Sequence, residues 1–92
     1  MNGWYNFRKD LLNVPHTEGV YLLSESDAPG IENAIYCGKA DDIHDRLSSH
    51  PDPNNPCLQQ KNIRYFAYEE INDSEARERE LIDAYDFQCN RV

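Results

Sequence analysis

Short apolar stretches alternate with polar, turn-forming stretches along the chain. Residues 19–24 (GVYLLS) and 34–38 (AIYCG) are apolar and contain β-branched or aromatic side chains, which is typical of buried strands. The segment between them is polar and contains a Pro-Gly pair, which predicts a turn or loop. Two strands joined by so short a connection are most simply an antiparallel pair.

The last third of the chain predicts another strand and a helix. Residues 61–71 (KNIRYFAYEEI) alternate, and both sets of side chains are rather apolar, so this strand is expected to be central and covered on both faces. Residues 72–87 open with capping residues and continue with a helical pattern. On that helix Glu78, Ile82 and Tyr85 share one face, and because Ile82 is apolar, Glu78 is expected to point inward.

A short helix is expected directly after the second strand. Ile43 and Leu47 are four residues apart, which fits one helical turn. Asp41 or Asp42 can cap its first turn, since a carboxylate accepts hydrogen bonds from free backbone N–H groups. Pro51 is expected to end it.

The N-terminal segment predicts a third helix. Over residues 4–12, the side chains of Trp4, Phe7, Leu11 and Leu12 fall on one side at helical spacing. The predicted order is helix, strand, strand, helix, strand, helix. This order indicates an α+β fold, in which a small three-stranded antiparallel sheet is flanked by helices.

Length and composition limit the classes of protein to consider. The chain has 92 residues, 39% of them hydrophobic, which suits one domain spanning residues 1–92. No apolar run approaches the roughly 20 residues that cross a bilayer. The N-terminus lacks the basic and apolar regions of a signal peptide. We therefore expect a cytoplasmic protein without a membrane partner.

The cysteines predict no cross-link. Cys37, Cys57 and Cys89 are odd in number and widely spaced, with no CxxC pair. This pattern argues against a structural zinc site and, in a reducing cytoplasm, against a disulfide. We expect all three to be small, partly buried apolar residues.

Two tyrosines are expected to meet on one face of the antiparallel pair. Because strand side chains alternate, Gly19 and Tyr21 point to one face of the first strand, as do Tyr36 and Gly38 on the second. In a suitable register the two phenols lie together beside a glycine. That glycine would permit close approach by a ligand backbone.

Basic side chains follow these strands. Lys39 comes directly after Gly38, while Arg46 and His50, four residues apart, lie one above the other on the predicted helix. Arg binds phosphate oxygens and stabilises charge that grows in a transition state. A phenol or imidazole can take a proton from water. The set indicates phosphoryl chemistry, which usually enlists a divalent ion, and Glu78 is the candidate ligand.

The order of these residues resembles the GIY-YIG endonuclease superfamily. The stretch GVY (19–21) corresponds to the first half-motif and YCG (36–38) to the second. The segment YCGKADDIHDRLSSH is similar to the family's Tyr-x-Gly-Lys, followed by Arg and, four residues later, His or Tyr. The segment EARERELIDAYDFQCN looks like the family's helix with a metal-binding Glu and a later Asn. The resemblance covers residues 15–90, and it looks similar to the nuclease domain of the bacterial excision-repair protein and to small stand-alone relatives.

This resemblance implies an enzyme that hydrolyses phosphodiester bonds in DNA with one Mg²⁺ or Mn²⁺ ion, in a repair, mobile-element or restriction role. It makes Glu78 the metal ligand, with Glu80 a neighbouring alternative that falls outside the family's register. Tyr36 or Tyr21 would deprotonate the attacking water. The residues that would bind the substrate or organise the site are Gly38, Lys39, Arg46, His50 and Asn90.

The net charge opposes DNA binding. Seventeen acidic and nine basic residues give a charge of −8, which would steer DNA poorly. Three conditions would each reconcile the negative charge with DNA binding. A divalent ion could be bound, a partner protein or additional chain could supply DNA affinity, or the cytoplasm could be salty. The alternative function is a catalytically inactive interaction module on the same fold, binding protein or nucleic acid. An inactive module would be expected to have lost a motif residue, and none is lost.

Overall fold

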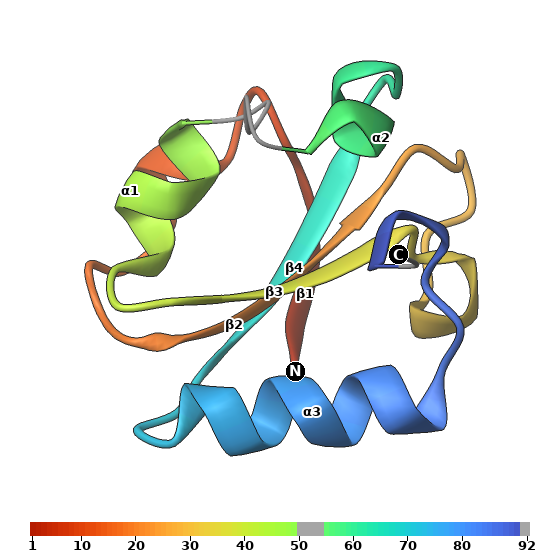
Figure 1. The fold of residues 1–92 in the computed structure, drawn as a ribbon. Helices are drawn as coiled ribbons and strands as arrows, with labels where there is room; N and C mark the ends of the chain where they lie inside the picture. Colours follow the sequence, from red (N-terminus) through yellow and green to blue (C-terminus); the bar gives the residue numbers. More distant parts are fainter. Residues whose placement is uncertain (50–54, 91–92) are drawn as a thin grey trace.

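A four-stranded antiparallel sheet forms the centre of the protein (Figure 1). The computed structural model describes residues 1–49 and 55–90. The α+β class is confirmed, but the expected number of strands, three, is wrong. The strands, which lie side by side in the order β1-β4-β2-β3, are β1 (Asn2–Asn6), β2 (Gly19–Ser24), β3 (Tyr36–Ala40) and β4 (Tyr65–Glu70).

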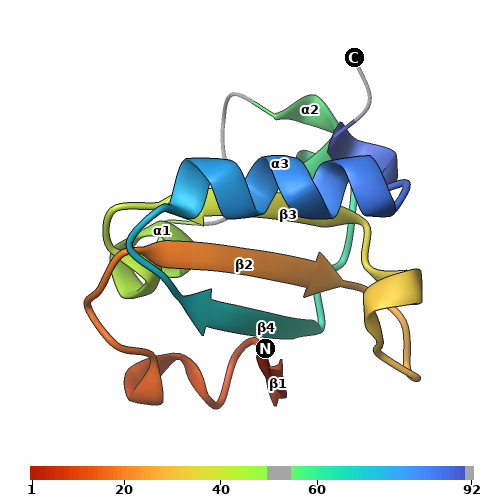
Figure 2. The ribbon, with the colours of Figure 1, turned by 90° about the horizontal axis from the view of Figure 1, so that it is seen from below.

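Helices cover both faces of this sheet (Figures 1 and 2). One face packs against α3 (Ser74–Ala84), and the other against α1 (Ile43–Ser48) and α2 (Pro56–Gln59). Three short 3-10 turns complete the described structure, at Leu11–Asn13, Ile31–Asn33 and Gln88–Asn90. Within the described residues, no helix has the length and apolar character needed to span a bilayer.

Two hydrophobic cores result from the alternation of side chains along the central strands. Every residue of β2 is buried. On one face Tyr21 and Leu23 pack with Phe66 and with the residues of α1 that point inward. On the opposite face Val20 and Leu22 pack with Leu81 of α3. The central position of β4, expected from its two apolar faces, is confirmed.

Aspartates begin the two longer helices. The Asp42 side chain accepts a hydrogen bond from the backbone N–H of Asp45 at 2.9 Å, and that of Asp73 accepts one from Ala76 at 3.2 Å. Each bond satisfies a donor that has no partner inside the helix. Of the two capping candidates for α1, Asp42 is therefore the cap.

The expected helix over residues 4–12 is wrong, because this segment begins as the edge strand β1. Trp4 packs into the core beneath α3, whereas the ring of Tyr5 lies 5.6 Å from that of Phe66 in the other core. This alternation has the period of a strand rather than a helix. Cross-strand aromatic contacts with β4 outweigh the helical spacing of the apolar residues. Leu12, expected on the apolar side, is 89% exposed.

The expectation of three unpaired cysteines is also wrong. Cys57 of α2 and Cys89 of the last 3-10 turn form a disulfide, although 32 positions separate them in sequence. The fold brings their Cα atoms to 5.4 Å, which is within the range for a disulfide. Only Cys37, among the described cysteines, is a free thiol, and it is fully buried.

Candidate active site

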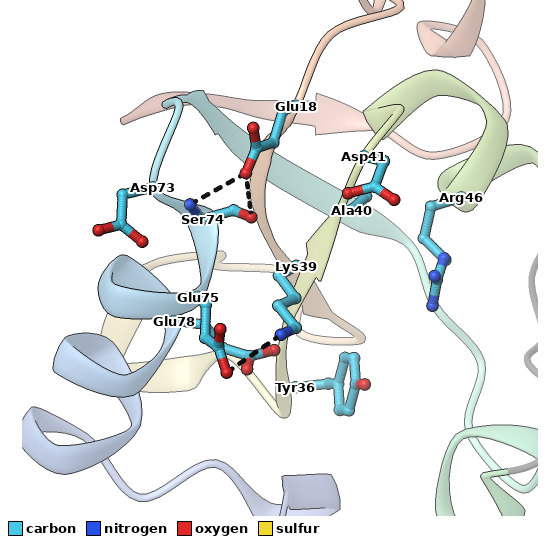
Figure 3. Close-up of a pocket in the computed structure, with 10 residues that line it drawn as sticks. All are labelled: Glu18, Tyr36, Lys39, Ala40, Asp41, Arg46, Asp73, Ser74, Glu75 and Glu78. Carbon is cyan, nitrogen blue, oxygen red and sulfur yellow. Dashed lines mark hydrogen bonds and ion pairs between the residues drawn. The ribbon is translucent and has the colours of Figure 1, made fainter.

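A surface pocket of about 550 Å³ lies where β3, α1 and the first turns of α3 meet (Figure 3). The sequence elements that form it are far apart in the chain and are brought together by the pairing of β3 with β2 and the packing of α3 on the sheet. Its wall is mostly acidic, with five carboxylates and two cations. The lining residues are Glu18, Tyr36, Lys39, Ala40, Asp41, Arg46, Asp73, Ser74, Glu75 and Glu78.

The two candidate tyrosines share a face of the sheet, as expected, but differ in access. In the β2–β3 register Tyr21 lies opposite Gly38, and Tyr36 lies opposite Leu23. The two phenol rings are 6.0 Å apart. The side chain of Tyr21 belongs to the core, with 1% of the residue exposed, whereas Tyr36 is half-buried and lines the pocket. Of the two, Tyr36 is the one that faces the pocket.

Gly38 makes room for Tyr21. A Cβ added at Gly38 would lie 2.4 Å from Cζ and 2.5 Å from the hydroxyl oxygen of Tyr21. The space beside this glycine, which the sequence suggested for a ligand, is thus filled by the protein's own phenol ring. Gly19 of the first half-motif is also tightly placed, since a Cβ there would lie 2.1 Å from the carbonyl oxygen of Glu69. Both half-motif glycines therefore permit close packing of the sheet.

The two cations enter the pocket from different elements. Lys39 projects from β3, and its Nζ lies 3.7 Å from Oε1 of Glu75 on α3. Arg46 projects from the last turn of α1, on the other side of Tyr36 from Glu75 and Glu78 (Figure 3). Within residues 1–49 and 55–90, the guanidinium of Arg46 has no hydrogen bond or ion pair. An anionic ligand could therefore bind it without displacing a described carboxylate.

Two of the pocket's carboxylates accept hydrogen bonds at the N-terminus of α3. Glu18 accepts hydrogen bonds from Oγ and N of Ser74, at 2.7 and 3.3 Å. Asp73 caps the same helix. Negative groups at a helix N-terminus are stabilised by the helix dipole. Glu18 could not be singled out from the sequence, because it precedes the first half-motif and only tertiary packing brings it to α3.

Glu78 is half-buried and points into the pocket, next to Glu75 (Figure 3). No other residue in the described part of the chain forms a hydrogen bond or ion pair with its carboxylate. The expected inward direction is confirmed, but not for the expected reason. Ile82, which was to share its face, is 37% exposed, and the inward face instead follows Ser74, Glu78 and Leu81.

Asn90 lies outside the pocket and acts on the backbone of β3. Its side chain accepts a hydrogen bond from N of Cys37 at 2.7 Å and donates one to the carbonyl of Cys37 at 2.9 Å. These bonds continue the ladder at an exposed edge strand. Asn90 therefore holds the residue next to Tyr36 in place. His50, the remaining candidate, lies outside the described residues.

Cys37 is chemically inert by position, since it points away from Tyr36 into the core beneath α3. Burial, and secondly the negative charge of Glu78, raises the pKa of its thiol to about 12. A thiol reacts as the thiolate.

We expect no alkylation of native protein by iodoacetamide at pH 8 and one alkylated cysteine after unfolding without reductant, measured by mass spectrometry. Because folding raises the pKa of Cys37, the buried thiol contributes to the free energy of unfolding. This contribution is fully present below about pH 9 and is lost as the pH rises towards 12.

Comparisons with known proteins place this fold. No protein-family model matches the chain, and no curated protein matches it. The fold is that of a GIY-YIG nuclease domain, as the sequence motifs indicated. It is similar to the GIY-YIG N-terminal endonuclease domain of UvrC from Thermotoga maritima, solved as a Tyr-to-Phe point mutant bound to its catalytic divalent cation. The match has a TM-score of 0.64 and 23% sequence identity, and it covers 94% of this chain and 96% of that one.

Proposed function

We propose that residues 1–92 form a nuclease domain that hydrolyses phosphodiester bonds in DNA with the help of one divalent cation. The observation that carries the proposal is the meeting of Tyr36, Arg46 and Glu78 in one pocket, from β3, α1 and α3. The similar fold of a GIY-YIG endonuclease domain that binds a catalytic divalent cation supports it. These three side chains supply a proton acceptor, an anion-binding group and a carboxylate ligand.

The carboxylate of Glu78 is a suitable ligand for a hard divalent cation. This carboxylate is half-buried in the pocket and without a described partner, so binding an ion breaks no interaction that the fold needs. Mg²⁺ is commonly held by one or two carboxylates together with waters and substrate phosphates. When bound, Mg²⁺ or Mn²⁺ would neutralise phosphate charge and lower the pKa of water. It would also offset the acidic wall of the pocket.

The pocket side chains then divide the remaining tasks. Tyr36 accepts the proton of the attacking water, because it lines the pocket while Tyr21 is buried beneath it. Arg46 binds the scissile phosphate and stabilises the charge of the transition state. Lys39 positions the phosphate once Glu75 releases it, and Gly38 leaves room for the ring of Tyr21 beneath the pocket. His50 and Asn90 complete the set as positioning residues.

Substitution of the two tyrosines tests the assignment of the base. We expect Tyr36→Phe to slow nicking of supercoiled plasmid in Mg²⁺ or Mn²⁺ by about 10²-fold, the lower end of the usual contribution of a general base. Tyr21→Phe, which removes the hydroxyl of the buried ring, should retain much more activity. Gel assays of initial rates, with circular dichroism to check folding, measure both. A larger loss in Tyr21→Phe than in Tyr36→Phe would reverse the assignment.

The acidity of the pocket favours a second candidate, a non-catalytic interaction module. Five carboxylates face two cations there, and Lys39 already lies beside Glu75. A module of this kind would bind a basic segment of a protein in preference to DNA. Absence of cleavage for all salts, ions and DNA structures tested, with retained folding, would favour it. Cleavage that depends on Glu78 would exclude it.

A further inference from the structure

A second cluster of metal-binding side chains lies outside the pocket, where the segment before β2 contacts α1. His16 comes from that segment, and His44 and Asp45 come from the first turn of α1. The two segments are joined by a backbone hydrogen bond from Ile43 to the carbonyl of Thr17 at 2.9 Å. The imidazole rings of His16 and His44 have their centroids 4.2 Å apart.

The ligand atoms of these three residues are spaced almost as a metal ion requires. They all lie within 4.8 Å of one another. Oδ1 of Asp45 is 3.6 Å from Nδ1 of His16 and 3.8 Å from Nδ1 of His44. Zinc bonds of about 2.0–2.1 Å in tetrahedral geometry place their ligand atoms about 3.3–3.5 Å apart. Small rotations of the exposed side chains of His16 and Asp45 towards the half-buried His44 would close the difference.

The hydrogen bonding of the cluster independently points to a ligand. Nδ1 of His44 is buried, and within the described residues it has no hydrogen-bond partner. A buried polar atom without a partner is uncommon in folded proteins and costs free energy. A metal ion held jointly with His16 and Asp45 would satisfy this atom.

Asp42 can complete the cluster without giving up its role in the fold. Its Oδ1 caps α1, and its Oδ2 lies 2.9 Å from Nδ1 of His16. Because Oδ2 faces the same nitrogen that would bind the ion, Asp42 joins the site as a further ligand once Nδ1 of His16 has given up its proton.

We propose that His16, His44 and Asp45, assisted by Asp42, bind a Zn²⁺-type cation at a site separate from the nuclease pocket. Two imidazoles and a carboxylate are ligands that zinc accepts, whereas Mg²⁺ prefers oxygen ligands alone. The site links the segment that leads into Glu18 to the helix that carries Arg46. It stabilises the fold by holding the two segments together.

Cobalt spectroscopy of the full chain tests this site. Co²⁺ titrated into wild-type protein with the Cys57–Cys89 disulfide intact should give the visible absorption bands of tetrahedral Co²⁺, and Zn²⁺ should abolish them by displacement. We expect His16→Ala and His44→Gln each to weaken binding by more than about 100-fold, and Asp42→Asn, which keeps a capping oxygen, by about 10–100-fold. Zn²⁺ should raise the unfolding midpoint of wild type but of neither His variant.

Two controls separate this site from others. Glu78→Gln should leave the cobalt bands unchanged, because that residue belongs to the nuclease pocket. His50→Gln, which removes the third histidine, should also leave them unchanged. The proposal is overturned if Co²⁺ gives no tetrahedral bands, if the bands survive in both His16→Ala and His44→Gln, or if Glu78→Gln removes them. Unfolding midpoints of the metal-free variants verify that each is folded.

Discussion

Glu78→Gln should reduce the rate of plasmid nicking by about 10³-fold or more in Mg²⁺ or Mn²⁺ while leaving the fold intact. A divalent cation at a phosphoryl group contributes several kcal/mol to the transition state, and each 1.36 kcal/mol is a factor of about ten in rate. Glutamine keeps the size of the side chain but loses the charge that holds the ion. Since Glu78 has no ion pair in the described structure, its replacement strands no cation, and the free energy of unfolding should change by less than about 0.5 kcal/mol.

Glu80→Gln is the matched control for this experiment. Glu80 lies on the same helix two residues later, but it is exposed and pairs with Arg77 instead of lining the pocket. Its substitution removes the same charge from the same helix and should leave the nicking rate near wild type. Equal losses in the two variants would indicate that any substitution on this part of α3 lowers activity, because removing a negative charge should by itself favour DNA binding. Full activity in Glu78→Gln would exclude Glu78 as the metal ligand.

The sequence predicted those elements whose local pattern agrees with their tertiary environment. The strand at residues 19–24 is apolar throughout, and it is buried on both faces. The cap at Asp42 is a local interaction between residues three apart in sequence. For such elements, propensity and packing favour the same structure.

The predictions that proved wrong share a different cause, which is contact between residues far apart in the chain. The apolar residues of segment 4–12 have a helical spacing, but the open edge of β4 offers the aromatic residues of β1 cross-strand partners that no local pattern reveals. The Cys57–Cys89 disulfide depends in the same way on the fold. Cysteine count and spacing do not report which residues the fold brings together.

At the candidate site, too, the order of motifs was predictable from the sequence, whereas features that depend on tertiary packing were not. Motif order was enough to predict that Tyr36, Lys39, Arg46 and Glu78 would converge, and the pocket contains all four. Sequence left open which tyrosine faces the pocket, because alternation places both phenols on one face and says nothing about depth. It also missed Glu18, whose hydrogen bonds to Ser74 connect the start of β2 to the start of α3.

Gly38→Ala is expected to lower the free energy of unfolding by about 2 kcal/mol, a fall of roughly 10 °C in the unfolding midpoint for a domain of this size. The new Cβ would lie 2.4 Å from the ring of Tyr21, which is fully enclosed in the core and has little freedom to move. Without that clash, alanine would be favoured over glycine in a strand by about 0.5–1 kcal/mol. Thermal and urea unfolding measure the change.

A double-mutant cycle identifies Tyr21 as the cause. In a Tyr21→Leu background the atoms that clash are absent, so Gly38→Ala should become neutral or stabilising, with a coupling of about 2 kcal/mol between the two positions. Gly30→Ala is the matched control, since a Cβ there meets no atom within 4 Å. If Gly38→Ala is equally destabilising in both backgrounds, backbone conformation rather than the phenol ring requires the glycine. If the coupling is found, the second half-motif glycine serves to seat one tyrosine beneath the other, so that Tyr36 alone faces the pocket.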